Sequence, residues 1–414
     1  MKLYKGLVQA TVEGLQDIFL KNRQADRVVE QLLKSNKKWG ARDRAFIAEN
    51  IYEIVRWWRL VKYVGEIDRV NDQEELWTIF GCWQIIKPAH LKLETDNELP
   101  DWTEFKDVKR DNILERYEEA LKVRKIAQSV PDWIDEIGEK ELGDKWDAEL
   151  AALNQQAPLI LRVNTLKSNI KAVREVFGLD DTEILPEIPN ALILKKRKNI
   201  ATQDTYKQGF FEVQDAGSQL IAPFLNIRPG LSVIDACAGA GGKTLHIASL
   251  MENKGQLIAM DLYESKLKQL KLRAKRNGAF NIEYRIIDTT KVIKKLHEKA
   301  DRVLIDAPCS GLGVLKRNPD AKWKLQPEFI DNIRKVQAEV LESYSKIVKP
   351  GGKLVYATCS VLPSENQEQV EKFLKTEIGK QFTFVKDRKI LASESGFDGF
   401  YMALLERKNA LIKE

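Results

Sequence analysis

Cysteine and histidine are scarce in this sequence, with four cysteines and three histidines among 414 residues. The cysteines lie far apart and form no CxxC pair, so their spacing favours neither a zinc site nor a disulfide framework. No histidine stands near the last of them, Cys359, which argues against a cysteine–histidine hydrolase. We therefore expect reduced thiols and no bound metal.

Long apolar runs are also missing, and none approaches the roughly 18–20 residues that a membrane span requires. The amphipathic amino terminus, MKLYKGLVQATVEGLQDIF, lacks the apolar core and cleavage site of a signal peptide. These absences lead us to expect a cytoplasmic protein. Its length predicts two or three domains, and a hydrophobic content of 43% is enough to bury their cores.

The modest net charge of +6 is unevenly distributed. Residues 1–60 carry +5, residues 61–205 carry −8 and residues 206–414 carry +9. Basic ends of this kind suit a polyanion such as nucleic acid, although ordinary solvated faces would produce the same distribution. Two basic segments, Lys195–Lys198 and Lys266–Arg276, are candidates for phosphate contacts.

Three regions differ in their patterns. Residues 1–130 have apolar positions at helical spacing, which predicts an all-helical domain. There, Trp57 and Trp58 could stack on RNA bases, but beside apolar helix positions they are more often core residues. Residues 131–205 contain short segments typical of a small α+β module, and residues 206–414 form the third region.

In the third region, short apolar runs alternate with helical stretches, which predicts a doubly wound parallel sheet and an α/β fold. Strands are expected at Leu231–Ala236, Leu257–Leu262, Ile282–Ile287, Arg302–Asp306 and Lys353–Thr358, with a final pair at Phe382–Val385 and Phe400–Leu405. In the preceding module, strands are expected at Pro158–Asn164 and Ala191–Leu194.

The first strand of the third region ends in a glycine-rich turn, IDACAGAGGKTLHIA, which is where a cofactor can approach the backbone. A Walker A loop would need glycine at Cys237, and a GxGxxG fingerprint beginning at Gly239 would need glycine at Thr244. Both matches fail. The turn of an S-adenosylmethionine-dependent methyltransferase remains the third interpretation.

Aspartates at the ends of the following strands favour that third interpretation. Asp261 can accept both hydroxyl groups of a ribose, Asp288 lies within reach of an adenine edge, and Asp306 ends the fourth strand. A single strand-end aspartate is often only a helix cap. Three in succession beside a glycine turn indicate a cofactor site.

Two cysteines also stand at strand ends, Cys309 in DAPCSG and Cys359 in TCS. Because neighbouring parallel strands end at the same edge, both thiols should face one crevice. Thiols beside a methyl donor imply a carbon acceptor such as carbon 5 of a pyrimidine, which becomes nucleophilic when a thiolate adds at carbon 6. Asp306 could donate a proton to ring nitrogen 3.

The segments DACAGAGGKT, DAPCSGLG, RNPDAKW, YATCSVLPSEN and GFDGFYMALLER, with Asp261 and Asp288, resemble the RsmB/Sun (Fmu) group of RNA cytosine-C5 methyltransferases. KWGARDRAFIAENIYEIVRWWR resembles a NusB-like RNA-binding domain, and LRVNTLK the start of the group's middle module. The resemblance extends over nearly the whole chain and implies a class I, Rossmann-like methyltransferase domain.

The resemblance also implies roles for individual residues. Cys359 would be the nucleophile, Cys309 would help to release the product, and Asp306 would line the base pocket. Asp261 would bind the cofactor's ribose and Asp288 its adenine. The methionine end would be held by Cys237, Ala238, Gly239, Ala240, Gly241, Gly242 and Lys243. The group's usual Ala-Pro is replaced by Gly239-Ala240, which puts cofactor affinity in question.

The implied partner is RNA, with 16S ribosomal RNA expected and transfer RNA as the alternative, and the chain is expected to be a monomer. A DNA cytosine methyltransferase would instead use Cys309 as its nucleophile and would have no use for Cys359. A non-catalytic RNA-binding scaffold would have no reason to keep two strand-end thiols and three strand-end acids.

Overall fold

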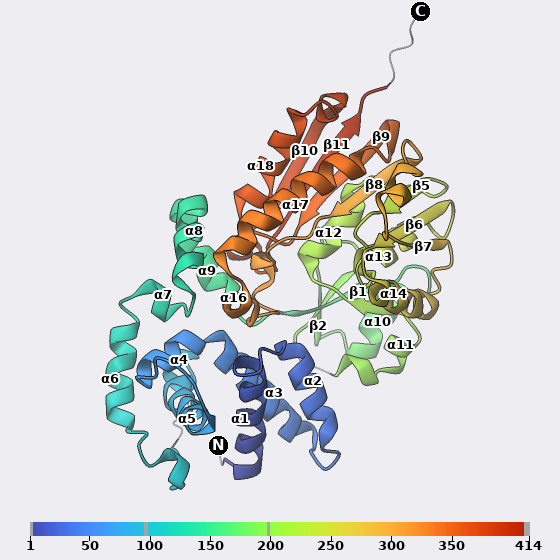
Figure 1. The fold of residues 1–414 in the computed structure, drawn as a ribbon. Helices are drawn as coiled ribbons and strands as arrows, with labels where there is room; N and C mark the ends of the chain where they lie inside the picture. Colours follow the sequence, from blue (N-terminus) through green and yellow to red (C-terminus); the bar gives the residue numbers. More distant parts are fainter. Residues whose placement is uncertain (1–2, 95–97, 197–198, 410–414) are drawn as a thin grey trace, which may run out of the picture. The chain divides into compact units, whose positions relative to one another are not determined.

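The computed structural model describes residues 3–94, 98–196 and 199–409 (Figure 1). Contacts between Cα atoms divide the chain into two compact units. The helical unit comprises residues 1–154 and 315–327, and the sheet unit comprises residues 155–314 and 328–414. The expected domains 1–130, 131–205 and 206–414 remain a prediction about sequence segments.

The helical unit is built from amphipathic helices whose apolar faces meet in one core. Its first helix, α1, buries Val8 and Leu15, and the central helix α5 buries Trp83 completely. The helices are α1 (Lys5–Phe19), α2 (Ala25–Ser35), α3 (Ala41–Arg56), α4 (Trp58–Val64), α5 (Gln73–His90), α6 (Arg110–Ala120), α7 (Arg124–Ala127), α8 (Asp132–Leu142) and α9 (Trp146–Leu153), with short 3-10 turns at Thr103–Phe105 and Gly143–Lys145. 

The tryptophan pair at the junction of α3 and α4 belongs to this core. Trp57 and Trp58 are each 8% exposed, and the ring of Trp58 stacks on Phe19 with centroids 3.5 Å apart. The indole nitrogen of Trp57 donates to Glu53. The interpretation of both residues as core is therefore confirmed.

The RNPDAKW segment, residues 317–323, packs within the helical unit although it follows the Cys309 motif in sequence. The indole nitrogen of Trp323 in α16 (Ala321–Lys324) donates to the carbonyl oxygen of Val55 at 2.6 Å. Asp320 accepts a hydrogen bond from the backbone nitrogen of Ala25 at 3.0 Å. These hydrogen bonds therefore hold the segment against helices α2 and α3.

The sheet unit contains a small antiparallel sheet in the order β2-β3-β1-β4. Its elements are β1 (Leu159–Val163), α10 (Ile170–Phe177), β2 (Thr182–Ile184), β3 (Ala191–Leu194), a 3-10 turn (Ile200–Thr202), α11 (Asp204–Lys207) and β4 (Phe211–Val213). One face packs Leu161 and Phe211 against Val173 of α10. The two strands predicted in this region are confirmed.

The larger sheet has seven strands over the described residues, in the order β10-β11-β9-β8-β5-β6-β7. The strands are β5 (Ser232–Asp235), β6 (Gln256–Asp261), β7 (Ile282–Ile286), β8 (Ala300–Asp306), β9 (Val348–Thr358), β10 (Phe382–Ile390) and β11 (Phe400–Arg407). From β5 the chain runs outward through β6 and β7 and then returns to β8 and β9 on the other side. The topological switch point therefore lies between β5 and β8.

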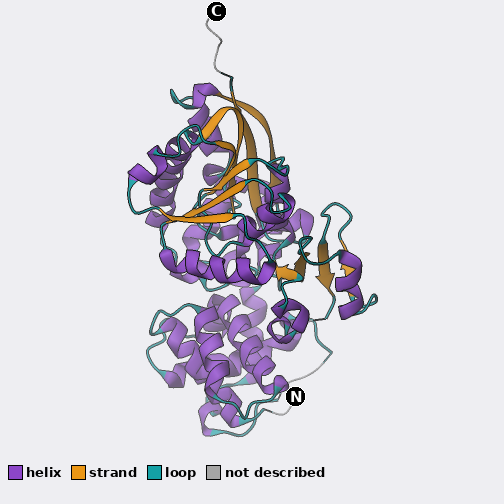
Figure 2. Cartoon of the chain, turned by 90° about the vertical axis from the view of Figure 1, so that its right-hand side faces the viewer, coloured by secondary structure: helices purple, strands orange, loops and turns teal. Residues whose placement is uncertain are grey.

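Helices cover both faces of this sheet, as Figure 2 shows. Leu245 and Leu270 are among the buried side chains of one face, and Leu341 and Phe373 are among those of the other. The first face carries α12 (Ala216–Phe224), α13 (Gly242–Leu250) and α14 (Glu264–Asn277). The second carries α15 (Thr290–Lys294), α17 (Pro327–Ser345) and α18 (Gln367–Leu374). The remaining short elements are 3-10 turns at Leu312–Val314, Pro363–Glu365 and Gly379–Gln381, and α19 (Ala392–Ser395).

The predicted α/β fold with a helical amino-terminal region is confirmed, with one difference in strand direction. Strands β5 to β9 are parallel, but β11 runs antiparallel to β9 and to β10. The sheet is therefore mixed rather than wholly parallel. The apolar pattern of a buried strand is the same in either direction, so it could not reveal this reversal.

Candidate active site

The glycine-rich turn joins β5 to α13 at the switch point of the large sheet. The backbone nitrogen of Ala238 donates to the carbonyl oxygen of Met260 at 2.8 Å, and that of Gly241 donates to Ala238 at 2.9 Å. Gly239 and Gly241 have φ angles of +53° and +89°, in the region that favours glycine. The turn therefore depends on glycine for its backbone path.

The two glycines have different surroundings. A β-carbon at Gly241 would lie 2.0 Å from Cδ1 of Leu270, so α14 packs against the turn too closely for a side chain. A β-carbon at Gly239 would have no heavy atom within 4 Å. The turn is thus packed on its α14 side and open beside Gly239, as a surface for a bound group must be.

Asp261, the last residue of β6, is linked to this turn. One carboxylate oxygen accepts from the backbone nitrogen of Gly239 at 2.8 Å, and the other accepts from that of Tyr263 at 2.8 Å. Because a carboxylate offers about four lone-pair positions, the side chain can still accept the hydroxyl groups of a ribose. Asp288 is exposed and lies two residues beyond the end of β7.

Lys243 and Asp306 form an ion pair at the switch point. The lysine Nζ lies 2.7 Å from a carboxylate oxygen of Asp306, and the two side chains are 15% and 27% exposed. Burial opposes the lysine charge, but Asp306, Cys359 and Asp235 outweigh it, and the pKa of Lys243 is raised. The sequence placed Lys243 with the cofactor's methionine end; the structure pairs it with the proposed base-pocket acid.

Two side chains near this ion pair, those of Asp235 and Cys237, are largely removed from water. Burial raises the pKa of Asp235 to about 7, although its carboxylate accepts a hydrogen bond from Thr244 at 2.7 Å. Burial, together with the charges of Asp235, Asp306 and Asp261, raises the pKa of the Cys237 thiol well above its ordinary value. Cys237 is therefore held as a neutral thiol near neutral pH.

The structure brings the two strand-end thiols together. The sulfur atoms of Cys309 and Cys359 lie 3.2 Å apart, and the backbone nitrogen of Cys359 donates to the sulfur of Cys309 at 3.3 Å. The strand ends are joined by a hydrogen bond from Ala307 to the carbonyl oxygen of Ala357 at 2.8 Å. The pKa of Cys309 is raised well above its ordinary value. The larger cause is the contact with the Cys359 thiol, and the second is burial.

Two arginines that were not predicted as site residues donate hydrogen bonds to carbonyl oxygens of the glycine turn. Arg273 of α14 donates to the carbonyl oxygen of Ala240 at 2.7 Å, and buried Arg162 of β1 donates to that of Gly242 at 2.6 Å. Buried Glu212 of β4 pairs with Arg273 at 2.9 Å. Arg162 stands in the quoted LRVNTLK segment, but nothing in that pattern indicated a partner 80 positions away.

Two basic segments were predicted to contact phosphates, and the structure describes the whole of residues 266–276 but only part of residues 195–198. Lys266, Lys271 and Lys275 on α14 are exposed. Of the run 195–198, Lys195 and Lys196 are exposed and Lys196 pairs with Asp181 at 2.8 Å. The last two residues of that run lie outside the described residues.

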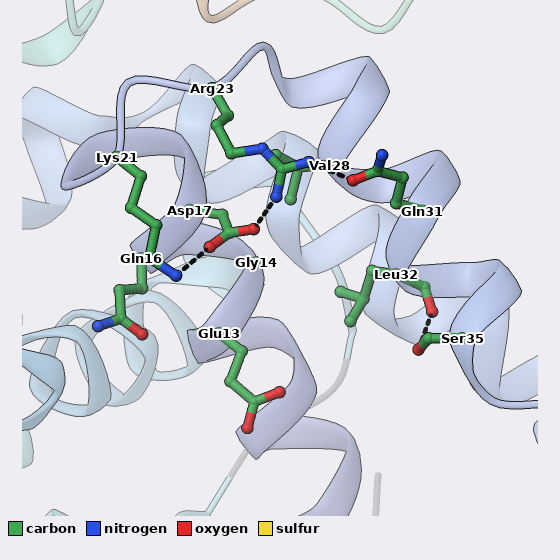
Figure 3. A pocket seen from close by; sticks show the side chains of 10 residues that line it. All are labelled: Glu13, Gly14, Gln16, Asp17, Lys21, Arg23, Val28, Gln31, Leu32 and Ser35. Carbon is green, nitrogen blue, oxygen red and sulfur yellow. Dashed lines mark hydrogen bonds and ion pairs between the residues drawn. The ribbon is translucent and has the colours of Figure 1, made fainter.

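A surface hollow of about 360 Å³ lies on the helical unit, and Figure 3 shows it between α1 and α2. It contains none of the expected site residues. Asp17 pairs with Lys21 at 2.8 Å and with Arg23, which also contacts Gln31. Its lining is Glu13, Gly14, Gln16, Asp17, Lys21, Arg23, Val28, Gln31, Leu32 and Ser35.

The described residues offer neither a membrane span nor a metal site. None of the described helices is both long and apolar enough to cross a membrane. Within the same residues, no group of three or more histidine, cysteine, aspartate or glutamate side chains is arranged to hold a metal ion.

Known proteins are similar to this chain in sequence and in structure. A family model described as 16S rRNA methyltransferase RsmB/F matches residues 222–406, and a ferredoxin-like domain model of RsmF/B-like methyltransferases matches residues 130–201. A probable ribosomal RNA small subunit methyltransferase B of Synechocystis sp. is 33% identical over 87% of each chain. Ribosomal RNA small subunit methyltransferase B of Vibrio vulnificus is 33% identical over 67% of this chain and 66% of its own length.

Solved structures share the fold. A protein designated PH0851 superposes with a TM-score of 0.82 at 24% identity, covering 98% of this chain and 100% of its own. NSun6 from Pyrococcus horikoshii, solved with SFG, has a TM-score of 0.62 at 20% identity and covers 68% of this chain and 99% of its own. These structures show the fold, and the sequence matches show that the chain belongs to the RsmB/F family of ribosomal RNA methyltransferases.

Proposed function

We propose that this chain methylates carbon 5 of a cytosine in RNA, with S-adenosylmethionine as the methyl donor and small-subunit ribosomal RNA as the substrate. The observation that carries the proposal is the separation of 3.2 Å between the sulfur atoms of Cys309 and Cys359 beside the Lys243–Asp306 ion pair. Two adjacent thiols provide one group to add to a ring carbon and another to assist its departure.

The residues around the glycine turn fit the proposed cofactor. The open space at Gly239 leaves room for a bound group, and Asp261 keeps acceptor positions for a ribose. Asp288 is proposed to contact the adenine, and residues 237–243 are proposed to hold the methionine end. When bound, S-adenosylmethionine supplies an electrophilic methyl group.

The proposed chemistry assigns different roles to the two thiols. Cys359 is proposed to be the thiol that attacks carbon 6 of the cytosine, as the resemblance implies, and the raised pKa of Cys309 favours the neutral form of that second thiol. The sulfur of Cys359 forms the new bond, and the ring's electron pair moves to make carbon 5 nucleophilic. After carbon 5 has gained the methyl group, its proton passes to a water molecule, the electron pair of that carbon–hydrogen bond re-forms the double bond between carbons 5 and 6, and Cys359 leaves as a thiolate.

Other residues stabilise the charges that arise. The Lys243 ammonium lies beside Asp306, and its raised pKa keeps a positive charge next to the site where the ring is proposed to bind. Asp306 is proposed to contact ring nitrogen 3, where charge develops during the addition. Cys309 is proposed to assist the release of Cys359 from the methylated product.

Further expectations belong to the same proposal. The helical region 1–130 is proposed to be a NusB-like RNA-binding domain, and residues 131–205 a small module that precedes the methyltransferase domain 206–414. The chain is proposed to act as a monomer in the cytoplasm, where the RNA named for its relatives would be its substrate.

The two cysteines provide the test. With Cys359→Ala, neither methylation nor a covalent complex should form. With Cys309→Ala, a protein–RNA adduct that requires the cofactor should accumulate and survive denaturing electrophoresis. Cys82→Ala is the matched control, because Cys82 is buried in the helical unit. The reverse pattern would assign the nucleophile to Cys309, as in the DNA-type enzymes.

Sequencing of bisulfite-treated RNA from a deletion strain identifies the substrate. A cytosine in small-subunit ribosomal RNA should lose its protection in that strain. Loss of protection in transfer RNA alone would replace the proposed substrate, and unchanged protection in all RNA, together with an absence of cofactor binding, would favour a non-catalytic scaffold.

A further inference from the structure

Glu365 is a completely buried carboxylate close to both cysteine loops. It ends the 3-10 turn Pro363–Glu365, six positions after Cys359. Moving a carboxylate out of water is unfavourable unless hydrogen bonds compensate for the lost hydration. The partners of this side chain therefore indicate why a carboxyl group is buried there.

Four hydrogen bonds end on the carboxylate of Glu365. One oxygen accepts from the hydroxyl of Ser310 at 2.5 Å and from that of Ser360 at 2.6 Å. The other accepts from the backbone nitrogen of Ser310 at 2.8 Å and from the amide of Gln337 at 2.9 Å. The amide of Gln337 also donates to the carbonyl oxygen of Pro308 at 3.0 Å.

Ser310 directly follows Cys309, and Ser360 directly follows Cys359. A single carboxylate therefore joins the residue next to one thiol to the residue next to the other. The two serine hydroxyls also lie 3.2 Å from each other. The bonds from Ser310 and Ser360 to one carboxylate restrict how far the two loops can separate, because each serine is one peptide unit from the neighbouring cysteine.

The turn that carries Glu365 is itself fixed. The hydroxyl of Tyr356 in β9 donates to the carbonyl oxygen of Glu365 at 2.7 Å. The side chain of Asn366 accepts from Thr358 at 2.5 Å and donates to the carbonyl oxygen of Ser360 at 2.9 Å. The carboxylate thus projects from a braced segment, which a spacer between two loops requires.

We propose that Glu365 is a positioning residue that fixes the separation of the thiols of Cys309 and Cys359. Its catalytic consequence rests on the proposed function, because it assumes that both thiols take part in one reaction. A buried side chain cannot touch RNA, so the loss of Glu365 should lower kcat and leave KM for RNA nearly unchanged.

A trivalent arsenical, phenylarsine oxide, measures the thiol separation without any methylation. Its arsenic forms bonds to two nearby sulfurs, while the two thiol protons leave with the oxygen as water. The full-length chain should bind it tightly, and Cys309→Ala or Cys359→Ala should abolish the two-sulfur complex. Glu365→Ala should weaken binding by about tenfold or more, as expected for the loss of buried hydrogen bonds to a charged group.

Gln219→Ala is the matched control. Gln219 is completely buried, lies on α12 and donates to the carbonyl oxygens of Gln214 at 3.0 Å and Leu161 at 3.3 Å. This variant removes a buried polar side chain that contacts neither cysteine loop nor the turn of Glu365, so arsenical binding should be unchanged. If Glu365→Ala does not fold, the double variant Ser310→Ala with Ser360→Ala removes both hydroxyl links and should weaken binding in its place.

Normal arsenical binding by a folded Glu365→Ala chain, or by the double serine variant where the first does not fold, would overturn the proposal. This result is distinct from failure of the proposed function. If the native chain methylates no cytosine but arsenical binding still depends on Glu365, the spacing role stands and only the reaction assigned to the thiols is wrong.

Discussion

The sulfur atoms of Cys309 and Cys359 lie 3.2 Å apart, although 50 positions separate the two residues in the chain. They meet because β8 and β9 are adjacent parallel strands, so the residues that follow them emerge at one edge of the sheet. At this distance the charge on one thiolate strongly disfavours a charge on the other.

Alkylation should distinguish the two thiols. Because contact with Cys359 and burial raise the pKa of Cys309, limited iodoacetamide at pH 7 should modify Cys359 first. Modification of Cys309 should become substantial only in alkaline solution. Mass mapping of the labelled peptides measures the order, and preferential labelling of Cys309 at pH 7 would contradict the assigned protonation states.

Asp261→Ala should weaken S-adenosylmethionine binding by roughly 1.5–3 kcal/mol, the range for hydrogen bonds to a charged group. The variant also removes the acceptor for the backbone nitrogens of Gly239 and Tyr263, so the turn should become less ordered. Calorimetric titration measures the affinity, with thermal unfolding as the check on folding. An unchanged affinity would remove Asp261 from the cofactor site.

Gly239→Ala and Gly241→Ala form a matched pair within one turn. Gly239→Ala meets no neighbouring atom, so it should cost only about 1 kcal/mol for an alanine at positive φ. Gly241→Ala places a methyl group against Leu270 and should cost more than about 2 kcal/mol. Urea unfolding measures both, and equal losses would show that the packing against α14 does not limit the turn.

Asp235→Asn should change the pH dependence of stability. The pKa of Asp235 is raised to about 7 in the folded chain, from an ordinary value of 3.8. The folded state therefore holds a proton that the unfolded state has released, and stability falls as pH rises from about 4 to 7. The asparagine variant avoids this loss and should be more stable than the native chain at pH 8 by roughly 1–4 kcal/mol.

Urea unfolding at pH 5 and pH 8 provides the measurement for this variant. The advantage should shrink at pH 5, where the native carboxyl is mostly protonated. The amide oxygen of the asparagine can accept the hydrogen bond from Thr244 that the carboxylate accepts, so the substitution should not lose this bond. A difference that is independent of pH would show that the carboxyl does not titrate in this range.

Neutralising the exposed lysines of α14 should reduce the salt dependence of RNA binding. Replacing Lys266, Lys271 and Lys275 with glutamine should lower the slope of log K against log salt by up to roughly 2, if each meets a phosphate. A control triple variant neutralises lysines that are ion-paired on the surface: Lys254, Lys372 and Lys380. Equal slopes for the two variants would leave α14 as an ordinary solvated face.

The sequence by itself determined the succession of elements and the place of the site along it. Apolar runs mark the central strands because these are buried between two helical layers. The run expected to end at Asp306 matches the end of β8 to the residue, and the run expected to end at Leu262 extends one residue beyond the end of β6. The expected end of the third strand at Ile287 is one residue beyond the end of β7, whose partly exposed pattern gives a weaker signal.

Only the tertiary structure decided which side chains meet. The Lys243–Asp306 pair, the arginines at the glycine turn and three of the four bonds to Glu365 join positions that are distant in sequence. The spacing of apolar residues indicates which side chains of an element face the core. It does not indicate which residue of another strand or loop each of those side chains contacts. The antiparallel direction of β11 was undetermined for the same reason, because strand pairing is fixed by long-range contacts.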